Sequence, residues 1–98
     1  MFPKPIRIKN PKLLQIIREQ PCVICHRSPC DPDHIVTRGA GGDDTPSNLW
    51  PLCRSCHTLR HSIGIHRLAQ RFPVCLMWLR DHGHDDIVEA VEEMNKLN

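Results

Sequence analysis

The chain has 98 residues, a net charge of +2, 40% hydrophobic and 4% aromatic residues, and as many as six Cys and seven His. A chain this short forms one small domain with a modest apolar core, which excludes a multi-domain enzyme, and the excess of Cys and His predicts that bound metal supplies part of the stability. No apolar run approaches the roughly 20 residues that cross a bilayer and no signal-peptide pattern is present, so we expect a cytoplasmic protein without a membrane partner.

The N-terminal third predicts an arm, a helix and a strand. Residues 1–10 are expected to form a basic extended arm, because Lys and Arg alternate with prolines. Asn10 followed by proline is a typical helix start, and a helix is expected over about 11–19. Two prolines predict irregular structure up to residue 32, and Asp33–Thr37 is the best strand candidate because β-branched residues follow one another there.

The rest of the chain predicts a loop and then helices. Residues 38–44 contain three glycines and are expected to form a flexible loop, after which 49–52 return to the fold. Helices are expected over about 54–62, ended by Gly64; over about 66–78 or 66–80, with Pro73 as a candidate break; and over about 85–96. We therefore expect residues 11–98 to form a single domain that follows the arm.

Two Cys-x-x-Cys pairs are the strongest chemical signal: Cys22 with Cys25, and Cys53 with Cys56. Four thiolates at this spacing can close a tetrahedral Zn²⁺ site. One such pair alone could be redox-active, and an even cysteine count would suit disulfides in a secreted protein, but two pairs in a basic cytosolic domain favour structural zinc. Cys30 could replace one ligand; otherwise it and Cys75 are expected to be small, partly buried thiols.

Acidic and histidine side chains lie between and just after the cysteine pairs. Asp33 and His34 are neighbours on the expected strand, so their side chains should point to opposite sides. His57 and His61 are four residues apart on an expected helix and should share a face. Asp33 and His57 could then hold a divalent ion, with His61 as a third ligand, while His34 remains free to act on water. Asn48 lies in a turn sequence and could equally be an ordinary cap.

Four short motifs occur here in a fixed order: Asp33-His34-Ile35, Gly41-Gly42, Asn48-Leu49 and Leu52-Cys53-x-x-Cys56-His57. Together they resemble the HNH endonucleases, in the branch whose two Cys-x-x-Cys pairs bracket a ββα-metal active site. The resemblance covers about residues 21–61 and leaves the arm and the helices of 62–98 outside it. It implies a small α+β fold with an HNH core held together by a four-cysteine zinc site and flanked by helices.

The resemblance also implies roles for single residues. His34 would be the general base, and Asn48 would fix the geometry of the loop and the imidazole. Asp33 and His57 would bind the catalytic ion; His61 matches the second histidine of His-x-x-x-His members, which many zinc-bearing members lack. The structural zinc ligands would be Cys22, Cys25, Cys53 and Cys56. Cys30 departs from the family pattern.

The implied reaction is hydrolysis of DNA phosphodiester bonds to 5′-phosphate and 3′-hydroxyl ends. A neutral imidazole would take a proton from water, and one Mg²⁺ or Mn²⁺ ion would neutralise charge on the phosphate. A single ion predicts nicking, or paired nicks by a homodimer. The alternatives are a zinc-stabilised nucleic-acid-binding module that does not cut, and a protein-interaction zinc module. DNA specificity, oligomeric state and membership of a larger phage or restriction assembly stay open.

Charge supports a nucleic-acid partner. Residues 1–80 contain 12 Lys and Arg against 5 Asp and Glu, whereas residues 81–98 contain one Lys against 6 acidic residues. A basic body with an acidic tail suits a polyanion-binding surface followed by a solvated helix, although ordinary surface charge could segregate in the same way. The basic side chains expected to contact DNA are Lys4, Arg7, Lys9, Arg38, Arg60 and Arg67.

Overall fold

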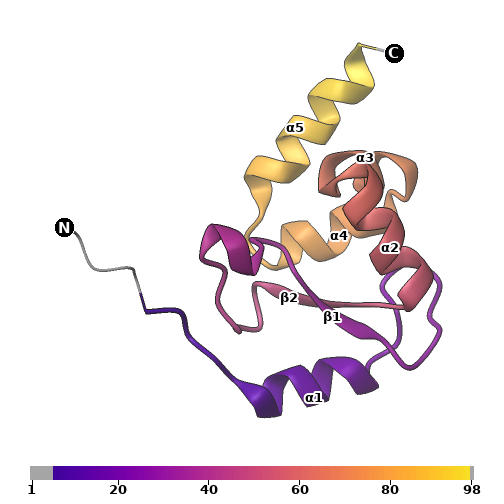
Figure 1. Cartoon of the computed structure of the whole chain (residues 1–98). Helices are drawn as coiled ribbons and strands as arrows, with labels where there is room; N and C mark the ends of the chain where they lie inside the picture. Colours follow the sequence, from indigo (N-terminus) through magenta and orange to yellow (C-terminus); the bar gives the residue numbers. More distant parts are fainter. Residues whose placement is uncertain (1–5, 98) are drawn as a thin grey trace.

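The computed structural model describes residues 6–97, which form a small α+β fold with one two-stranded sheet and five α-helices (Figure 1). The elements in chain order are α1 (Pro11–Glu19), β1 (Asp31–His34), the short 3-10 helix η1 (Arg38–Ala40), β2 (Leu49–Leu52), α2 (Arg54–Ile63), α3 (Ile65–Arg71), α4 (Val74–Asp81) and α5 (Asp85–Lys96). Nowhere in residues 6–97 is there a helix with the length and apolar character needed to cross a membrane.

Local sequence signals explain where the helices begin and end. The Asn10 side chain accepts a hydrogen bond from the backbone N–H of Leu13 at 3.1 Å, which caps α1. Gly64, with φ of 84°, separates α2 from α3, since this backbone conformation is unfavourable for other residues. The predicted helices over 11–19, 54–62 and 85–96 are confirmed, and Pro73 divides the helix expected from residue 66 onwards into α3 and α4.

β1 and β2 form an antiparallel hairpin in which Asp33 lies opposite Trp50. The predicted strand Asp33–Thr37 was wrong in its bounds. Pairing with β2 starts at Asp31, so the strand includes Pro32. Proline is tolerated there because both strands of a two-stranded sheet are edge strands. The strand pairing stops after His34 because the Asn48 side chain forms hydrogen bonds with both backbone groups of Val36. Its Oδ1 accepts from the Val36 N–H at 2.7 Å, and its Nδ2 donates to the Val36 carbonyl at 3.1 Å.

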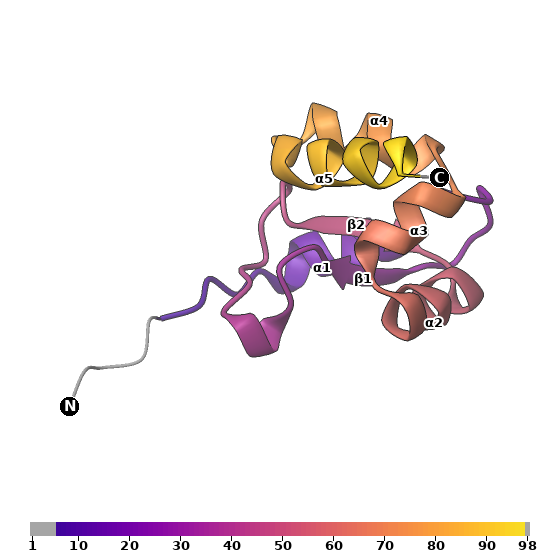
Figure 2. The same cartoon turned by 90° about the horizontal axis from the view of Figure 1, so that it is seen from above.

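The hairpin lies between α1 on one side and the group of helices α2 to α5 on the other (Figures 1 and 2). Trp50 and Leu52 of β2 are fully buried and pack with Leu68 of α3, Leu79 of α4 and Val91 of α5 in one hydrophobic core. Burial of these apolar side chains holds the C-terminal helices against the sheet. Phe72 and Trp78 pack against this core and are half-buried.

The end of the N-terminal arm, residues 6–10, forms neither helix nor strand and is bound to the loop between the strands. The backbone N–H of Ile8 donates to Asp43 Oδ1 at 2.7 Å, and the N–H of Asp44 donates to the Ile8 carbonyl at 2.9 Å. Lys4, an expected DNA contact, lies outside the described residues.

Gly42 occupies a position in this loop where no other residue fits. A Cβ atom there would lie 1.7 Å from the carbonyl oxygen of Val36. We predict that Gly42→Ala lowers the free energy of unfolding by about 3 kcal/mol, since backbone must shift to relieve the overlap. Gly39→Ala is the matched control, because nothing lies within 4 Å of its Cβ position. Urea denaturation of both variants checks this, and equal stability would contradict the close packing of the loop.

Candidate active site

The four cysteines of the two Cys-x-x-Cys pairs cluster, with their sulfur atoms all within 4.8 Å of one another. Sγ of Cys25 lies 3.5 Å from Sγ of Cys53. Thiolates bound to a tetrahedral Zn²⁺ at about 2.3 Å are roughly 3.8 Å apart, so the cluster fits a structural zinc ion. Cys53 caps α2 and Cys56 lies in its first turn, so zinc at this cluster would fix the start of α2 to the 22–25 segment.

The surroundings of the cluster also favour the ionised, thiolate form of Cys22. Burial raises the pKa of Cys22, but the backbone N–H groups of Cys25, Cys53 and Ile24 outweigh this effect and lower the pKa to about 7. Cys30 lies outside the cluster and donates its S–H to the Arg27 carbonyl at 3.2 Å. Burial raises the pKa of Cys30 to about 11, as expected for a thiol that is not a ligand.

Asp33 is almost completely buried, and both of its oxygens have defined neighbours. Oδ2 accepts a hydrogen bond from Trp50 Nε1 at 2.7 Å and from Arg60 Nε at 3.0 Å. Arg60 also donates to the backbone carbonyls of His34 and Ile35, each at 3.2 Å. Since these donors fix the carboxylate in one orientation, Oδ1 is directed toward α2.

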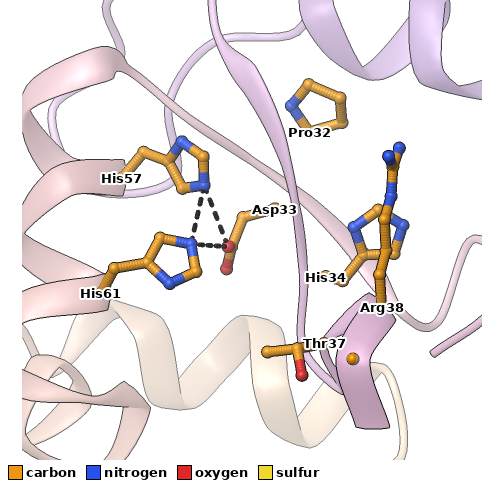
Figure 3. Close-up of a pocket in the computed structure, with 8 residues that line it drawn as sticks. Pro32, Asp33, His34, Thr37, Arg38, His57 and His61 are labelled. Carbon is orange, nitrogen blue, oxygen red and sulfur yellow. Dashed lines mark hydrogen bonds and ion pairs between the residues drawn. The ribbon is translucent and has the colours of Figure 1, made fainter. Parts of the chain in front are cut away.

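Oδ1 of Asp33 meets the two histidines of α2. It lies 3.3 Å from Nε2 of His57 and 3.3 Å from Nε2 of His61, and the two Nε2 atoms are 3.0 Å apart. Neighbouring ligands of an octahedral ion, at about 2.1 to 2.3 Å from it, are roughly 3.0 to 3.3 Å apart. The three atoms therefore have the spacing of one face of a coordination octahedron. Figure 3 shows the three side chains directed toward one another.

The hydrogen bond at Nδ1 of His57 supports this interpretation. Asp31 Oδ2 lies 2.9 Å from His57 Nδ1, and a carboxylate only accepts, so in the neutral ring Nδ1 carries the hydrogen and Nε2 bears a lone pair. That lone pair faces Asp33 Oδ1, a second acceptor. Two acceptors 3.3 Å apart repel each other unless a proton or cation lies close to both. This donor set fits a divalent metal ion.

His34 follows Asp33 on β1 but contacts a different part of the chain. Its Nε2 lies 2.7 Å from Asp44 Oδ1, and the side chain is 8% exposed. Burial raises the pKa of Asp44, but hydrogen bonds from His34, Asn10 and Arg7 outweigh it and hold that pKa well below its usual range. Because the ionised carboxylate only accepts, Nε2 of His34 donates, and Nδ1 of the neutral ring keeps its lone pair.

Asn48 connects the two sides of the loop between the strands. Besides its two hydrogen bonds to Val36, its Nδ2 donates to the Asp43 carbonyl at 2.8 Å. The side chain is therefore placed to hold the loop, and through it Asp44, in one position. This is a positioning contact rather than a contact with a reacting atom.

One pocket of about 360 Å³ is shared by the Asp33, His57 and His61 group and by His34. It is lined by Asp33, His57 and His61 on one side and by His34, Thr37 and Arg38 on the other (Figure 3). His57 and His61 also line an adjoining hollow along α2 that is bordered by Arg54. The pocket therefore places Asp33, the two histidines of α2 and His34 beside the same space, with Arg38 as a cationic side chain in its lining.

Two of the expected DNA contacts are placed differently by the structure. Arg60 is buried, with 7% of its surface exposed, and its guanidinium is bound to Asp33 and two carbonyls, so it cannot reach a phosphate. Arg7 donates to Asp44 at 2.9 Å and is only partly exposed. Lys9, Arg38 and Arg67 are exposed.

Three residues that shape the site had no role in the sequence analysis, and a fourth, Arg60, was expected there only as a DNA contact. Asp31 holds the imidazole of His57, and Asp44 holds that of His34. Trp50 and Arg60 hold Asp33. The sequence does place Asp31 two residues before Asp33, on the same side of a strand, but only a strand beginning at residue 31 makes that spacing informative. The other three contacts join positions 10 to 27 residues apart and have no local signal.

Comparison with known proteins gives a family without an assigned activity. A family model described as protein of unknown function (DUF968) matches residues 1–66, so the chain belongs to this family. No curated protein and no solved structure matches the chain. The matched part includes both cysteine pairs, the hairpin and α2, and it ends at the start of α3.

We predict that Cys53→Ser removes bound zinc and unfolds much of the domain, since structural zinc binding and folding are coupled. Metal analysis and thermal melting check this, with a loss of one zinc per chain and a large fall in Tm expected. Cys30→Ser is the control, because a serine hydroxyl can make the same hydrogen bond to the Arg27 carbonyl and the residue lies outside the cluster. Full zinc content in Cys53→Ser, with unchanged melting, would contradict the assignment.

Proposed function

We propose that this protein is a metal-dependent DNA endonuclease that hydrolyses phosphodiester bonds to 5′-phosphate and 3′-hydroxyl ends. The observation that carries the proposal is the convergence of Asp33, His57 and His61 on atoms 3.0 to 3.3 Å apart, in a pocket that His34 also lines. A binding module has no evident use for a metal-ligand set beside a separately held imidazole.

The order of elements supports the same proposal. An antiparallel hairpin is followed at once by α2, with Asp33 on the first strand and the two histidines on the helix. This is the order of a ββα-metal core as the resemblance to HNH endonucleases implies it. We therefore take β1, β2 and α2 as the catalytic core, with the four-cysteine cluster at its base.

In the proposed reaction the chain's own groups have separate tasks. His34 accepts a proton at Nδ1 from the attacking water, while Asp44 receives the hydrogen bond from Nε2 and stabilises the imidazolium that forms. Asp33, His57 and His61 would hold the divalent ion, and the imidazole pair suits Mn²⁺ at least as well as Mg²⁺. The ion, when bound, supplies positive charge to a phosphate oxygen and to the leaving oxygen.

The surface around the pocket suits a phosphate backbone. Arg38 lines the pocket and Arg54 lines the adjoining hollow on α2, so each of the two hollows has a basic side chain in its lining. Arg38 and Arg67 are exposed and can contact DNA, and such contacts would give sequence-independent, salt-sensitive affinity. Within residues 6–97 a single oxygen- and nitrogen-donor set of this kind is found, which favours nicking of one strand at a time.

We predict that His34→Ala lowers the rate of nicking of supercoiled plasmid with Mn²⁺ or Mg²⁺ by about 10²- to 10⁴-fold, the usual contribution of a general base. His66→Ala is the control, since His66 is exposed on α3 and does not line the pocket. Zinc content and helicity of both variants should match the wild type, and His34→Ala is expected to melt at a lower temperature because buried Asp44 loses one donor. Equal nicking by His34→Ala would exclude His34 as the base, and no nicking by any form would favour a non-catalytic nucleic-acid-binding module.

We also predict that His61→Ala weakens Mn²⁺ binding at least about tenfold, because one of three ligands is lost. His61 is half exposed, so its removal should leave folding intact. Calorimetric titration of the zinc-loaded protein with Mn²⁺ measures the affinity, with His66→Ala again as the control. Unchanged Mn²⁺ affinity in His61→Ala would show that this histidine is not a ligand.

A further inference from the structure

The N-terminal arm is connected to His34, the candidate general base, through the buried carboxylate of Asp44. Asp44 is 3% exposed and accepts hydrogen bonds from three donors. Its Oδ1 accepts from His34 Nε2 at 2.7 Å and from Arg7 Nη1 at 2.9 Å, and its Oδ2 accepts from the backbone N–H of Asn10 at 2.9 Å. Two of the three donors thus belong to a segment more than 30 residues away in the sequence.

The arm is held by more than this carboxylate. Arg7 also donates to the Gly42 carbonyl at 3.3 Å, and the backbone of Ile8 is hydrogen-bonded to both Asp43 and Asp44. A short stretch of arm therefore lies along the loop as an additional extended segment. Moving the arm away would remove two of the donors to Asp44 and leave a buried carboxylate poorly compensated.

We propose that Asp44 and Arg7 are positioning residues for His34: the docked arm holds Asp44, and Asp44 holds the imidazole with Nδ1 presented as the proton acceptor. The catalytic meaning of this contact rests on the proposed nuclease function, but the contact itself does not. A ring with one nitrogen bound to a fixed carboxylate has a defined orientation, and a base must be well oriented to take a proton efficiently.

The proposal changes the role of Arg7. Its guanidinium is used inside the protein, so it is not a phosphate contact, although it lies in a basic segment. Lys12 offers a matched comparison, because it is a basic residue of α1, near Arg7 in the sequence, and its side chain is exposed.

The first experiment tests the contact without using activity. In proton NMR spectra of the ¹⁵N-labelled, zinc-loaded protein, the Nε2–H of His34 should give a downfield signal protected from solvent exchange, assigned by its absence in His34→Ala. We expect Asp44→Asn to weaken or shift this signal, Arg7→Ala to increase its exchange rate, and Lys12→Ala to leave it unchanged. A signal that is identical in wild type, Asp44→Asn and Arg7→Ala would overturn the proposal.

The second experiment separates positioning from DNA binding. Single-turnover nicking with DNA saturated by protein should be slower in Arg7→Ala by about tenfold and in Asp44→Asn by about 10²-fold, as small misplacements of reacting groups cause. DNA affinity and its salt dependence should match the wild type. His34→Ala combined with Asp44→Asn should be no slower than His34→Ala alone, since both changes remove the same function.

The outcomes are distinguishable. If Arg7→Ala instead weakens DNA binding, lowers the salt slope by about one and nicks at the wild-type rate when saturated, Arg7 is a phosphate contact and the proposal is wrong. If the wild type does not nick DNA, the proposed function fails, while the NMR comparison still decides whether Asp44 and Arg7 position the imidazole. Zinc content and melting of every variant show whether its fold is retained.

Discussion

The carboxylate of Asp33 is the interaction on which the rest of the site depends. A buried carboxylate is unfavourable unless donors surround it, and this one is 2% exposed. Trp50 from β2 and Arg60 from α2 supply those donors, so strand and helix must lie where both can reach one oxygen. Arg60 also donates to the carbonyls of His34, the last residue of β1, and of Ile35, which fixes the position of the helix against the hairpin. The second oxygen is consequently directed to one place, where His57 and His61 meet it.

The four-cysteine cluster and the Asp33 contacts hold α2 at two points. The cysteines act at its first turn, and Arg60 acts near its end, two turns later. Between these points lies His57, whose Nδ1 is held by Asp31. A domain of this size has a limited core, and the helices α3 to α5 supply most of the apolar packing on one side of the sheet. Metal at the cysteines, of which Cys22 and Cys53 belong to the same core, would therefore add to the stability of the start of α2, the helix that carries His57 and His61.

Much of the framework could be predicted from the sequence because the signals are local. The cysteine spacing, the Asn10 cap, the break at Pro73 and the four-residue interval between His57 and His61 each depend on neighbours within one or two turns. The bounds of β1 could not be predicted, since the side chain that ends its pairing belongs to Asn48, beyond a long loop. Buried arginines could not be recognised either. Arg7 and Arg60 look like any surface arginine until the fold brings Asp44 and Asp33 to them.

A common arrangement underlies the three side chains that carry the proposed chemistry. Asp33 has one oxygen bound by donors, His57 has Nδ1 bound by Asp31, and His34 has Nε2 bound by Asp44. In each case the bound atom fixes the orientation of the side chain, and for the two rings it also determines which nitrogen keeps the lone pair. The remaining atoms are an anionic oxygen and two ring nitrogens, all acceptors, around a single pocket. A pocket that presents acceptors on fixed side chains binds a cation and accepts a proton without first rearranging, and such preorganisation is the property that efficient hydrolysis requires.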